Sequence, residues 1–378
     1  KYQEALAECR AILAKHAEPL AAYSSKCKLC HWYSLCGEQL TAANDLTLIP
    51  FLGRNIRDAM IDDVPDIAAL ADSNPDAFIT PRNRTIFPGL GADRLRLFHE
   101  RAVMLTKPDA KPYLRAPVTL RLAPTELFFD IEVDPFRDLC YLHGIVERHD
   151  GRNETEKFVY FFAEEDNEKA EQEMFAAAYS YLADKPDAAI YYYSKYERTT
   201  YRGLQAKYPD VCDADDIERL FDPARSVDLY GDVVIRATEW PTRDHSIKTL
   251  AKYLGFNWRD THPSGAASIE WFDRWCRERD PEVKQRILEY NEDDCRATRV
   301  LLRRRRKANW PSTGRPRVAA VKSPCWESTP RFWMWPTLST SSSGRVRLTA
   351  KSETWREWMT SPSTFASSMV AFGPANRS

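Results

Sequence analysis

The sequence predicts an α/β protein in which a mixed β-sheet is flanked by helices and preceded by a small α-helical region. Three observations support this fold class. Three apolar and aromatic segments follow one another from residue 126, separated by short polar loops, as expected for strands. Helical patterns then alternate with a further strand, which is typical of a sheet covered by helices. Residues 1–40 open with a helical pattern and then hold three closely spaced cysteines.

Length and composition indicate a globular protein of more than one domain. The chain has 378 residues, 43% hydrophobic and 29% charged, which is enough for two or three domains. It has no apolar run long enough to span a bilayer, so we expect no membrane partner. Nine cysteines, three of them clustered, argue against a secreted disulfide framework and favour a reducing, cytoplasmic location. The chain begins at Lys1 instead of Met, so we expect its true N-terminus to be missing.

Charge is distributed unevenly along the chain. Residues 303–378 hold 14 Lys and Arg against 3 Asp and Glu, which leaves 40 basic and 52 acidic residues in 1–302. The last 76 residues also hold six of the 11 tryptophans and show no helix or strand periodicity. One interpretation is a basic, aromatic tail that binds nucleic acid. The interpretation we favour is a frameshifted or foreign segment, because a solvated tail avoids tryptophan.

The N-terminal part reads as three successive segments. Residues 1–40 begin with a helix over 2–16, where apolar positions recur at three and four residues. Residues 41–75 hold two short helical patterns around a tight turn at Phe51-Leu52-Gly53. Residues 76–124 are rich in proline, and we predict a linker there with one helix near 92–105.

The α/β domain is predicted over residues 125–302. The strand patterns lie at 126–134, 140–149, 157–165 and 188–194. The helical patterns lie at 167–184, 196–208, 246–256 and 281–306. The third helix is expected to end at Gly255, and the fourth to start at Pro281, a favoured first-turn residue.

Acidic residues in this domain follow a pattern that predicts a metal site. Asp130 and Glu132 are two apart on a strand, so they face the same side. Two like charges that close cost free energy unless a cation lies between them. Tyr290 and Asp294 are four apart and share one helix face. Glu197 starts the helix after the fourth strand, near the strand end where such sites gather.

Together these residues resemble the RNase H-like proofreading-exonuclease superfamily, in its tyrosine variant. The resemblance rests on "DIE" at the first strand, an acid after the fourth strand and a closing "YxxxD" helix. It implies that Asp130, Glu132, Glu197 and Asp294 bind two Mg²⁺ or Mn²⁺ ions, which remove nucleotides from a 3′ end. It also implies that Tyr290 orients the attacking water. The superfamily usually has Asp where this chain has Glu197, which puts activity in question.

The cysteines Cys27, Cys30 and Cys36 have the spacing C-x2-C-x5-C. So tight a triplet favours a zinc ion or an iron–sulfur cluster, both of which need four ligands, and Cys9 is the nearby fourth candidate. The spacing resembles the C-terminal end of RecB-like nucleases, where such cysteines join an upstream one around a [4Fe–4S] cluster. The resemblance implies that residues 1–40 are a truncated remnant in which the cluster is incomplete.

The segment "LTLIPFLGRNIRDAMI" resembles a helix–hairpin–helix, whose turn approaches DNA phosphates without reading sequence. Gly53 fits that motif, whereas Phe51 stands where the first glycine is preferred. The alternative is a helical hairpin used for packing. Over residues 15–302 the order of segments resembles bacterial RecB-like nucleases with a second, RNase H-like exonuclease domain. Longer members continue into a superfamily-1 helicase, which this chain replaces with its tail.

The sequence therefore predicts a metal-dependent 3′→5′ exonuclease in DNA repair or processing. Its substrate is nucleic acid, single-stranded DNA in preference to RNA, with Lys195 or Lys248 as phosphate contacts. A superfamily-1 helicase is the implied protein partner. The alternative is a catalytically degenerate module that binds nucleic acid or acts as a scaffold, which Glu197 and the broken flanks favour. A weaker alternative is a hydrolase of another phosphate ester.

Overall fold

The computed structural model describes residues 2–16, 19–24, 26–27, 30–118, 120–121, 123–261 and 264–307, with side chains up to Leu302. All of these residues belong to one compact unit. The predicted tail lies outside the described residues from position 308 onward.

The regular elements described in residues 2–106 are all helices. Its elements are α1 (Tyr2–Leu13), α2 (Tyr33–Ala42), the 3-10 helix η2 (Leu46–Leu48), α3 (Arg54–Met60), α4 (Ile67–Asp72), the 3-10 helix η3 (Pro75–Phe78) and α5 (Ala92–Thr106). The short helices are fixed by a buried ion pair. Asp45 accepts a hydrogen bond from the Thr47 N–H at 2.7 Å, and its other oxygen pairs with buried Arg57 at 2.6 Å.

Helix α5 shares one apolar core with the helices before it. Leu95, Phe98 and Ala102 of α5 are buried in the same cluster as Leu46 and Met60. Part of the segment for which the sequence predicts a linker thus contributes to the core of the helical region.

A five-stranded mixed sheet forms the centre of the second half of the chain. Its strands are β2 (Thr125–Asp134), β3 (Leu139–His149), β4 (Arg152–Phe162), β5 (Ala189–Tyr192) and β6 (Ser226–Asp228), in the order β4-β3-β2-β5-β6. Strand β3 pairs antiparallel with both β2 and β4, whereas β5 pairs parallel with both β2 and β6. The predicted mixed sheet flanked by helices is confirmed.

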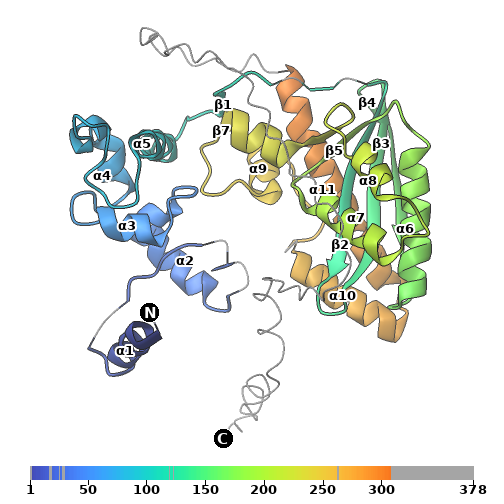
Figure 1. Ribbon diagram of the computed structural model, residues 1–378, viewed down its shortest axis with the longest axis horizontal. Coiled ribbons are helices and arrows are strands. Elements are labelled where there is room, and N and C mark those ends of the chain that lie inside the picture. The colour runs from blue at the N-terminus through green and yellow to red at the C-terminus, as the bar shows by residue number, and fades with distance from the viewer. Residues whose placement is uncertain are drawn as a thin grey trace, which may run out of the picture. The chain divides into compact units, whose positions relative to one another are not determined.

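Seven helical elements accompany the sheet. They are α6 (Glu168–Ala183), α7 (Tyr196–Lys207), α8 (Ala214–Leu220), the π-helix η4 (Leu229–Ile235), α9 (Ile247–Tyr253), α10 (Gly265–Glu278) and α11 (Pro281–Lys307). In Figure 1, α6 and α11 lie on opposite sides of the strands. The sequence predicted α6, α7, α9 and α11 but not α8, η4, α10 or the short strand β6.

The alternation of side chains along β2 divides the core in two. Leu127, Phe129 and Ile131 point into a cluster with α6, α7 and α10. Phe128 points the other way, into a cluster with α9, η4 and the second half of α11. Because Asp130 and Glu132 share the phase of Phe128, they belong to the face that α11 covers.

A buried ion cluster joins the helical region to the α/β region. Glu239, on the short strand β7 (Thr238–Glu239), is fully buried and accepts two hydrogen bonds from Arg101 of α5, at 2.8 and 3.1 Å. Arg115 adds a second guanidinium at 2.8 Å. Strand β1 (Tyr113–Leu114) pairs with β7 beside it. The segment that precedes the five-stranded sheet is therefore bound to strand β7 by ion pairs and by backbone hydrogen bonds.

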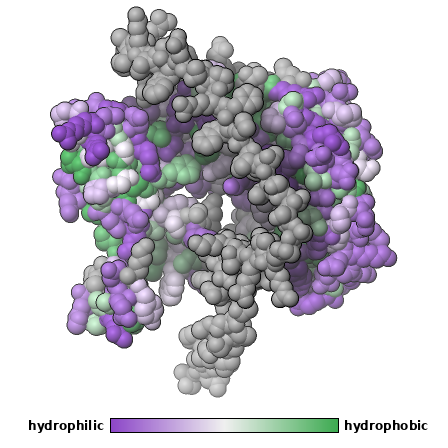
Figure 2. All heavy atoms as spheres, in the orientation of Figure 1, coloured by the Kyte–Doolittle hydropathy of each residue, from purple (hydrophilic) through white to green (hydrophobic). Residues whose placement is uncertain are grey.

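One face of the α/β region is mainly polar. In Figure 2 hydrophilic side chains dominate the face over α6 and α10. No helix within the described ranges is long and apolar enough to cross a membrane.

Candidate metal centre

Strand β2 supplies the first two acids of the site. Asp130 lies opposite Gly144 of β3, and Glu132 lies opposite Leu142. A β-bulge follows directly after Glu132, where the register shifts before Val133. Bulges re-aim side chains next to functional sites. Glu132 is buried, while Asp130 is partly exposed, so the pair lies where β2 meets solvent.

Helix α11 supplies the third acid and lies directly on the sheet. Its residue Asn291 donates a hydrogen bond from Nδ2 to Asp130 Oδ2 at 2.8 Å. The close approach depends on Gly144, where a Cβ atom would come within 1.6 Å of Asn291 Oδ1. One turn along the same face, Cys295 donates to the Gly144 carbonyl at 3.3 Å. This contact sets how far Asp294 lies from the acids of β2.

Asp130, Glu132 and Asp294 form one cluster of possible metal ligands. A carboxylate oxygen from each lies within 4.8 Å of the other two, and no other group of this kind occurs in the described part of the chain. Glu197, the fourth predicted acid, is buried in the first turn of α7 and stands outside that limit. Its carboxylate accepts a hydrogen bond from the Tyr193 backbone, but Oε2 finds no partner among the described residues.

Crowding of buried acids changes their protonation. Burial, and then the charge of Asp294, raises the pKa of Glu132 to about 8. Burial also raises the pKa of Asp130 well above its ordinary value, with further increases from Asp294 and Glu132. Burial raises the pKa of Glu197 to about 8, with a contribution from Asp228. Each shift reflects the free-energy cost of ionising these acids together without a compensating cation.

One lysine partly compensates this charge. Lys248 of α9 approaches Asp294 at 3.4 Å and donates a hydrogen bond to the Tyr290 hydroxyl at 2.8 Å. Its charge lowers the pKa of both Asp130 and Glu132, but less than burial raises it. Lys248 was predicted as a phosphate contact, and the structure places it at the acids themselves. No contact to the acids is seen for Lys195, which is the residue before α7.

Tyr290 lies beside the acids, as the helix spacing predicted. Its side chain is buried, with the hydroxyl oriented toward Lys248. Burial and the charges of Asp294, Glu132 and Asp130 raise its pKa. The hydroxyl therefore stays protonated and can donate to an oxygen at the cluster while it accepts from Lys248.

Two supporting residues were not singled out from the sequence. Asn291 holds Asp130, and Trp258 donates from Nε1 to Asp294 Oδ1 at 2.9 Å. Asn291 immediately follows Tyr290, so its position within "YNEDD" was a usable signal. Trp258 comes from the loop after α9, and nothing in its local sequence indicates the contact.

The other predicted sites are not assembled into a comparable group. Cys27 and Cys36 are partly buried, Cys9 and Cys30 are exposed, and all four are free thiols. The zinc or iron–sulfur site stays a prediction. Asp228, a further acid of the α/β region, caps the π-helix η4 by accepting from the Gly231 N–H at 3.0 Å. The turn of the predicted helix–hairpin–helix has positive φ at both Phe51 (66°) and Gly53 (73°), but its DNA-binding role is likewise untested.

The donor set fits a hard divalent cation. All three clustered ligands are carboxylates, and magnesium and manganese prefer oxygen donors. The Oε2 atom of buried Glu197 provides a further oxygen, one that lacks a hydrogen-bond partner among the residues that the structure describes. Buried polar atoms of this kind need an explanation such as an ion.

Comparison with known proteins agrees with this geometry. Residues 127–305 match a family model described as the RNase H superfamily. No curated protein and no solved structure matches the chain. The matched range begins in β2 and ends in α11, and it includes every acid of the cluster. Residues 127–305 therefore form an RNase H-like domain, which indicates nuclease-type hydrolysis of nucleic acid.

Proposed function

We propose that the RNase H-like domain is a metal-dependent 3′→5′ exonuclease that acts on single-stranded DNA. The observation that carries the proposal is the cluster of Asp130, Glu132 and Asp294, with a protonated tyrosine one helical turn before Asp294. A phosphodiesterase needs oxygen ligands for cations and a group that orients water, and the cluster offers both.

Four acids have the ligand role in this proposal. Asp130, Glu132, Glu197 and Asp294 would hold two divalent ions, whose charge makes a water molecule nucleophilic and stabilises the leaving oxygen. Asn291 and Trp258 hold two of these carboxylates in place by hydrogen bonds of 2.8 and 2.9 Å. Fixed outer partners of this kind keep ligands oriented.

Tyr290 has the orienting role. Its hydroxyl donates to the attacking water while it accepts a hydrogen bond from Lys248, which sets the direction of the O–H group. Lys248 also neutralises part of the charge around Asp294 and is available to a substrate phosphate, because about a third of its side chain is exposed.

The test uses the full chain with single-stranded DNA labelled at its 5′ end and Mn²⁺. We expect a ladder of shortening products that disappears with EDTA and with Asp130→Ala. DNA labelled at its 3′ end should release the labelled mononucleotide first. Tyr290→Phe should lower the rate on the order of 100-fold, as for misplacement of a reacting group.

Intact DNA from folded protein would contradict the proposal. If that protein still binds the oligonucleotide, it belongs to the alternative class of nucleic-acid-binding modules. The position of Glu197 outside the 4.8 Å cluster is the observation that favours this alternative.

The wider setting is also part of the proposal. We infer a role in DNA repair or processing, together with a superfamily-1 helicase. Its support is the order of the cysteine triplet, the hairpin turn and the exonuclease motifs along the sequence.

A further inference from the structure

Two adjoining cavities lie between the hairpin turn and the loop before α9. The larger, of about 860 Å³, is bordered by Pro50, Phe51, Tyr193, Tyr230 and His245, and we call it the hairpin cavity. The smaller, of about 560 Å³, lies against α2. Both are lined by Tyr23, Arg243 and Asp244, so the two cavities adjoin at these residues.

Phe51 is an unusual residue for its position. Its φ of 66° is a left-handed conformation that disfavours a bulky side chain by about 1–2 kcal/mol. Burial does not offset this cost in full, because 54% of the residue is exposed. The ring lies edge-on to the His245 imidazole, with centroids 5.5 Å apart. A glycine would adopt this conformation without that cost.

His245 is a buried polar group without partners. Only 4% of it is exposed, and neither ring nitrogen has a hydrogen-bond partner among the described residues. Burial, and then the charge of Arg101, lowers its pKa to about 4, so the imidazole is neutral near pH 7. A neutral imidazole offers one donor and one acceptor. Leaving both unused costs free energy that a ligand with a matching edge would recover.

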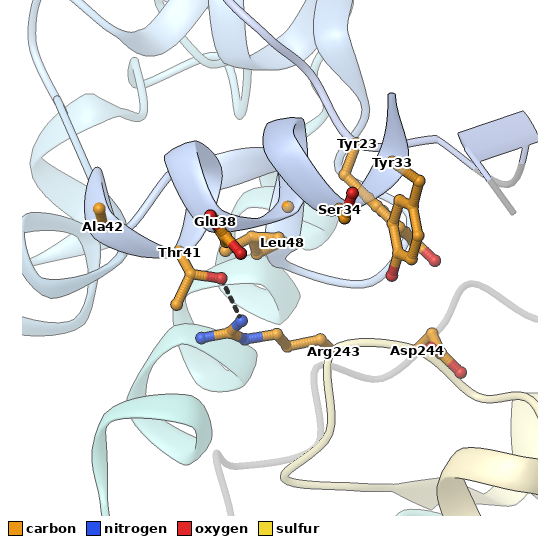
Figure 3. Close-up of a pocket in the computed structure, with 10 residues that line it drawn as sticks. Tyr23, Tyr33, Ser34, Glu38, Thr41, Ala42, Leu48, Arg243 and Asp244 are labelled. Atoms are coloured by element: carbon orange, nitrogen blue, oxygen red, sulfur yellow. Dashed lines mark hydrogen bonds between the residues drawn. The ribbon is translucent and has the colours of Figure 1, made fainter. Parts of the chain in front are cut away.

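Arg243 provides the positive charge of the hollow. Its guanidinium donates to Thr41 Oγ1 at 2.8 Å, as Figure 3 shows, and it forms no ion pair within the described ranges. The neighbouring Asp244 carboxylate accepts from both the backbone and the hydroxyl of Ser246, at 2.8 and 2.7 Å. Arg243 is thus a cation held in place by a neutral hydrogen-bond partner.

Several residues of the hairpin-cavity wall are neighbours of site residues. Tyr193, whose hydroxyl bonds to the His245 carbonyl at 2.6 Å, also supplies a backbone hydrogen bond to Glu197. Tyr230 follows Asp228 closely in the chain, and its ring lies 5.5 Å from that of Tyr193. Ser246 borders the cavity and is two residues before Lys248. The cavity wall is thus connected, through these neighbouring residues, to the part of the chain that carries the acids.

We propose that the hairpin cavity binds one nucleotide of a single-stranded nucleic acid, with the base on Phe51 and Tyr230 and a phosphate at Arg243. The inference rests on the proposed function for the identity of the strand. The half-exposed Phe51 ring turns to stack on the base. This movement uncovers the His245 nitrogens, which then form hydrogen bonds with the polar edge of the base. Stacking on aromatic rings together with a nearby cation is the usual chemistry of sequence-tolerant single-strand binding.

The test scans an oligothymidylate with a single abasic residue moved along it, using the full chain and Mn²⁺. For the wild type we expect one position, away from the scissile end, at which KM rises about tenfold, as for loss of one stacked base. Phe51→Gly should raise KM for the intact strand by a similar factor at unchanged kcat and abolish the sensitivity at that position. Arg243→Gln should lower the salt dependence of binding by about one phosphate contact.

Controls separate this inference from the proposed function. Phe51→Gly suits the positive φ, so folding is preserved. Tyr160→Ala is the matched control, because it removes a 44% exposed ring from β4, away from the cavity.

A nitrophenyl ester of thymidine 5′-phosphate should be hydrolysed equally by wild type and Phe51→Gly. Binding to the same strands in EDTA is followed by fluorescence anisotropy. If the wild type hydrolyses neither substrate, the proposed function fails. The anisotropy measurement then still shows whether Phe51→Gly weakens binding of the oligonucleotide, which tests the hairpin cavity independently. Equal affinity and KM in wild type and Phe51→Gly overturn the inference.

Discussion

At the scale of single residues, the site is a balance between crowded acids and one lysine. Three carboxylates converge within 4.8 Å, and Lys248 is the cation beside them. Glu197 adds a buried acid whose Oε2 has no hydrogen-bond partner in the described part of the chain. An uncompensated buried acid is costly in the free protein, but it becomes favourable once a cation binds.

Glu197→Gln should separate stability from activity. Above pH 8 in EDTA, the substitution removes a charge that the fold disfavours, so we expect an equal or higher Tm. With Mn²⁺ the variant should lose much of the metal-induced rise in Tm, and its nuclease rate should fall at least about 10–100-fold. Thermal unfolding and oligonucleotide cleavage measure the two effects. Glu173→Gln, on the exposed side of α6, is the control, and a variant with unchanged activity would exclude Glu197 as a ligand.

At the scale of elements, the site depends on how closely α11 lies on β3. Gly144 has no side chain, and Asn291 fills the space above it while it holds Asp130 on the neighbouring strand. The helix thus brings Asp294 to β2 through a contact made on β3. A small change at the contact between Gly144 and Asn291 therefore moves Asp294, which is not part of that contact.

Gly144→Ala should therefore disturb both the fold and the site. The new methyl group overlaps Asn291, so we expect a loss of about 1–3 kcal/mol in the free energy of unfolding and lower Mn²⁺ affinity. Asn291→Ala provides the space, so the double variant should recover much of the stability but not the affinity, because Asp130 has lost its partner. Urea unfolding and Mn²⁺ titration of the wild type, the two single variants and the double variant complete a double-mutant cycle. Additive losses in stability would show that the two residues do not compete for space.

At the scale of the whole molecule, folding and metal binding are linked through protons. The pKa values of Glu132 and Glu197 rise from 4.5 in the unfolded chain to about 8 in the metal-free fold. Between these values the folded state binds more protons than the unfolded state, so stability falls as pH rises through this window. A bound cation replaces those protons and removes the loss.

Mn²⁺ should consequently raise Tm more at pH 8 than at pH 6. We expect roughly 3 °C for each kcal/mol of difference, measured by calorimetry with Mn²⁺ and with EDTA. Buried His143 and His245, with pKa values lowered to about 3 and about 4, act in the opposite direction below pH 6.5. They contribute equally with and without metal, so the difference isolates the carboxylates. The same rise at both pH values would contradict the linkage.

Local pattern was sufficient to predict most of the α/β region. The alternation around Asp130 and Glu132 and the four-residue spacing of Tyr290 and Asp294 both translate directly into shared faces. The structure brings these four side chains together. Strand β6 was missed because three residues are too few to show alternation, and helices α8 and α10 were also missed.

Long-range contacts were beyond the reach of local pattern. Trp258 meets Asp294 across 36 residues, and Arg101 meets Glu239 across 138, and neither pair has a periodic signature. Lys248 was considered for phosphates, but its place between Tyr290 and Asp294 depends on how α9 packs against α11. Such contacts follow from tertiary packing, which a single sequence does not encode in any short window.

The ion cluster around Glu239 has a consequence for where this domain can be cut. The family match starts at residue 127, yet both guanidinium groups that neutralise the fully buried Glu239 lie before it, on Arg101 and Arg115. A fragment trimmed to the matched range would carry a buried anion with no counterion, a defect that typically costs about 3–5 kcal/mol. The shortest fragment that we expect to fold stably therefore starts upstream of α5. It includes the helical segment because that segment supplies the arginine that pairs with Glu239 from α5.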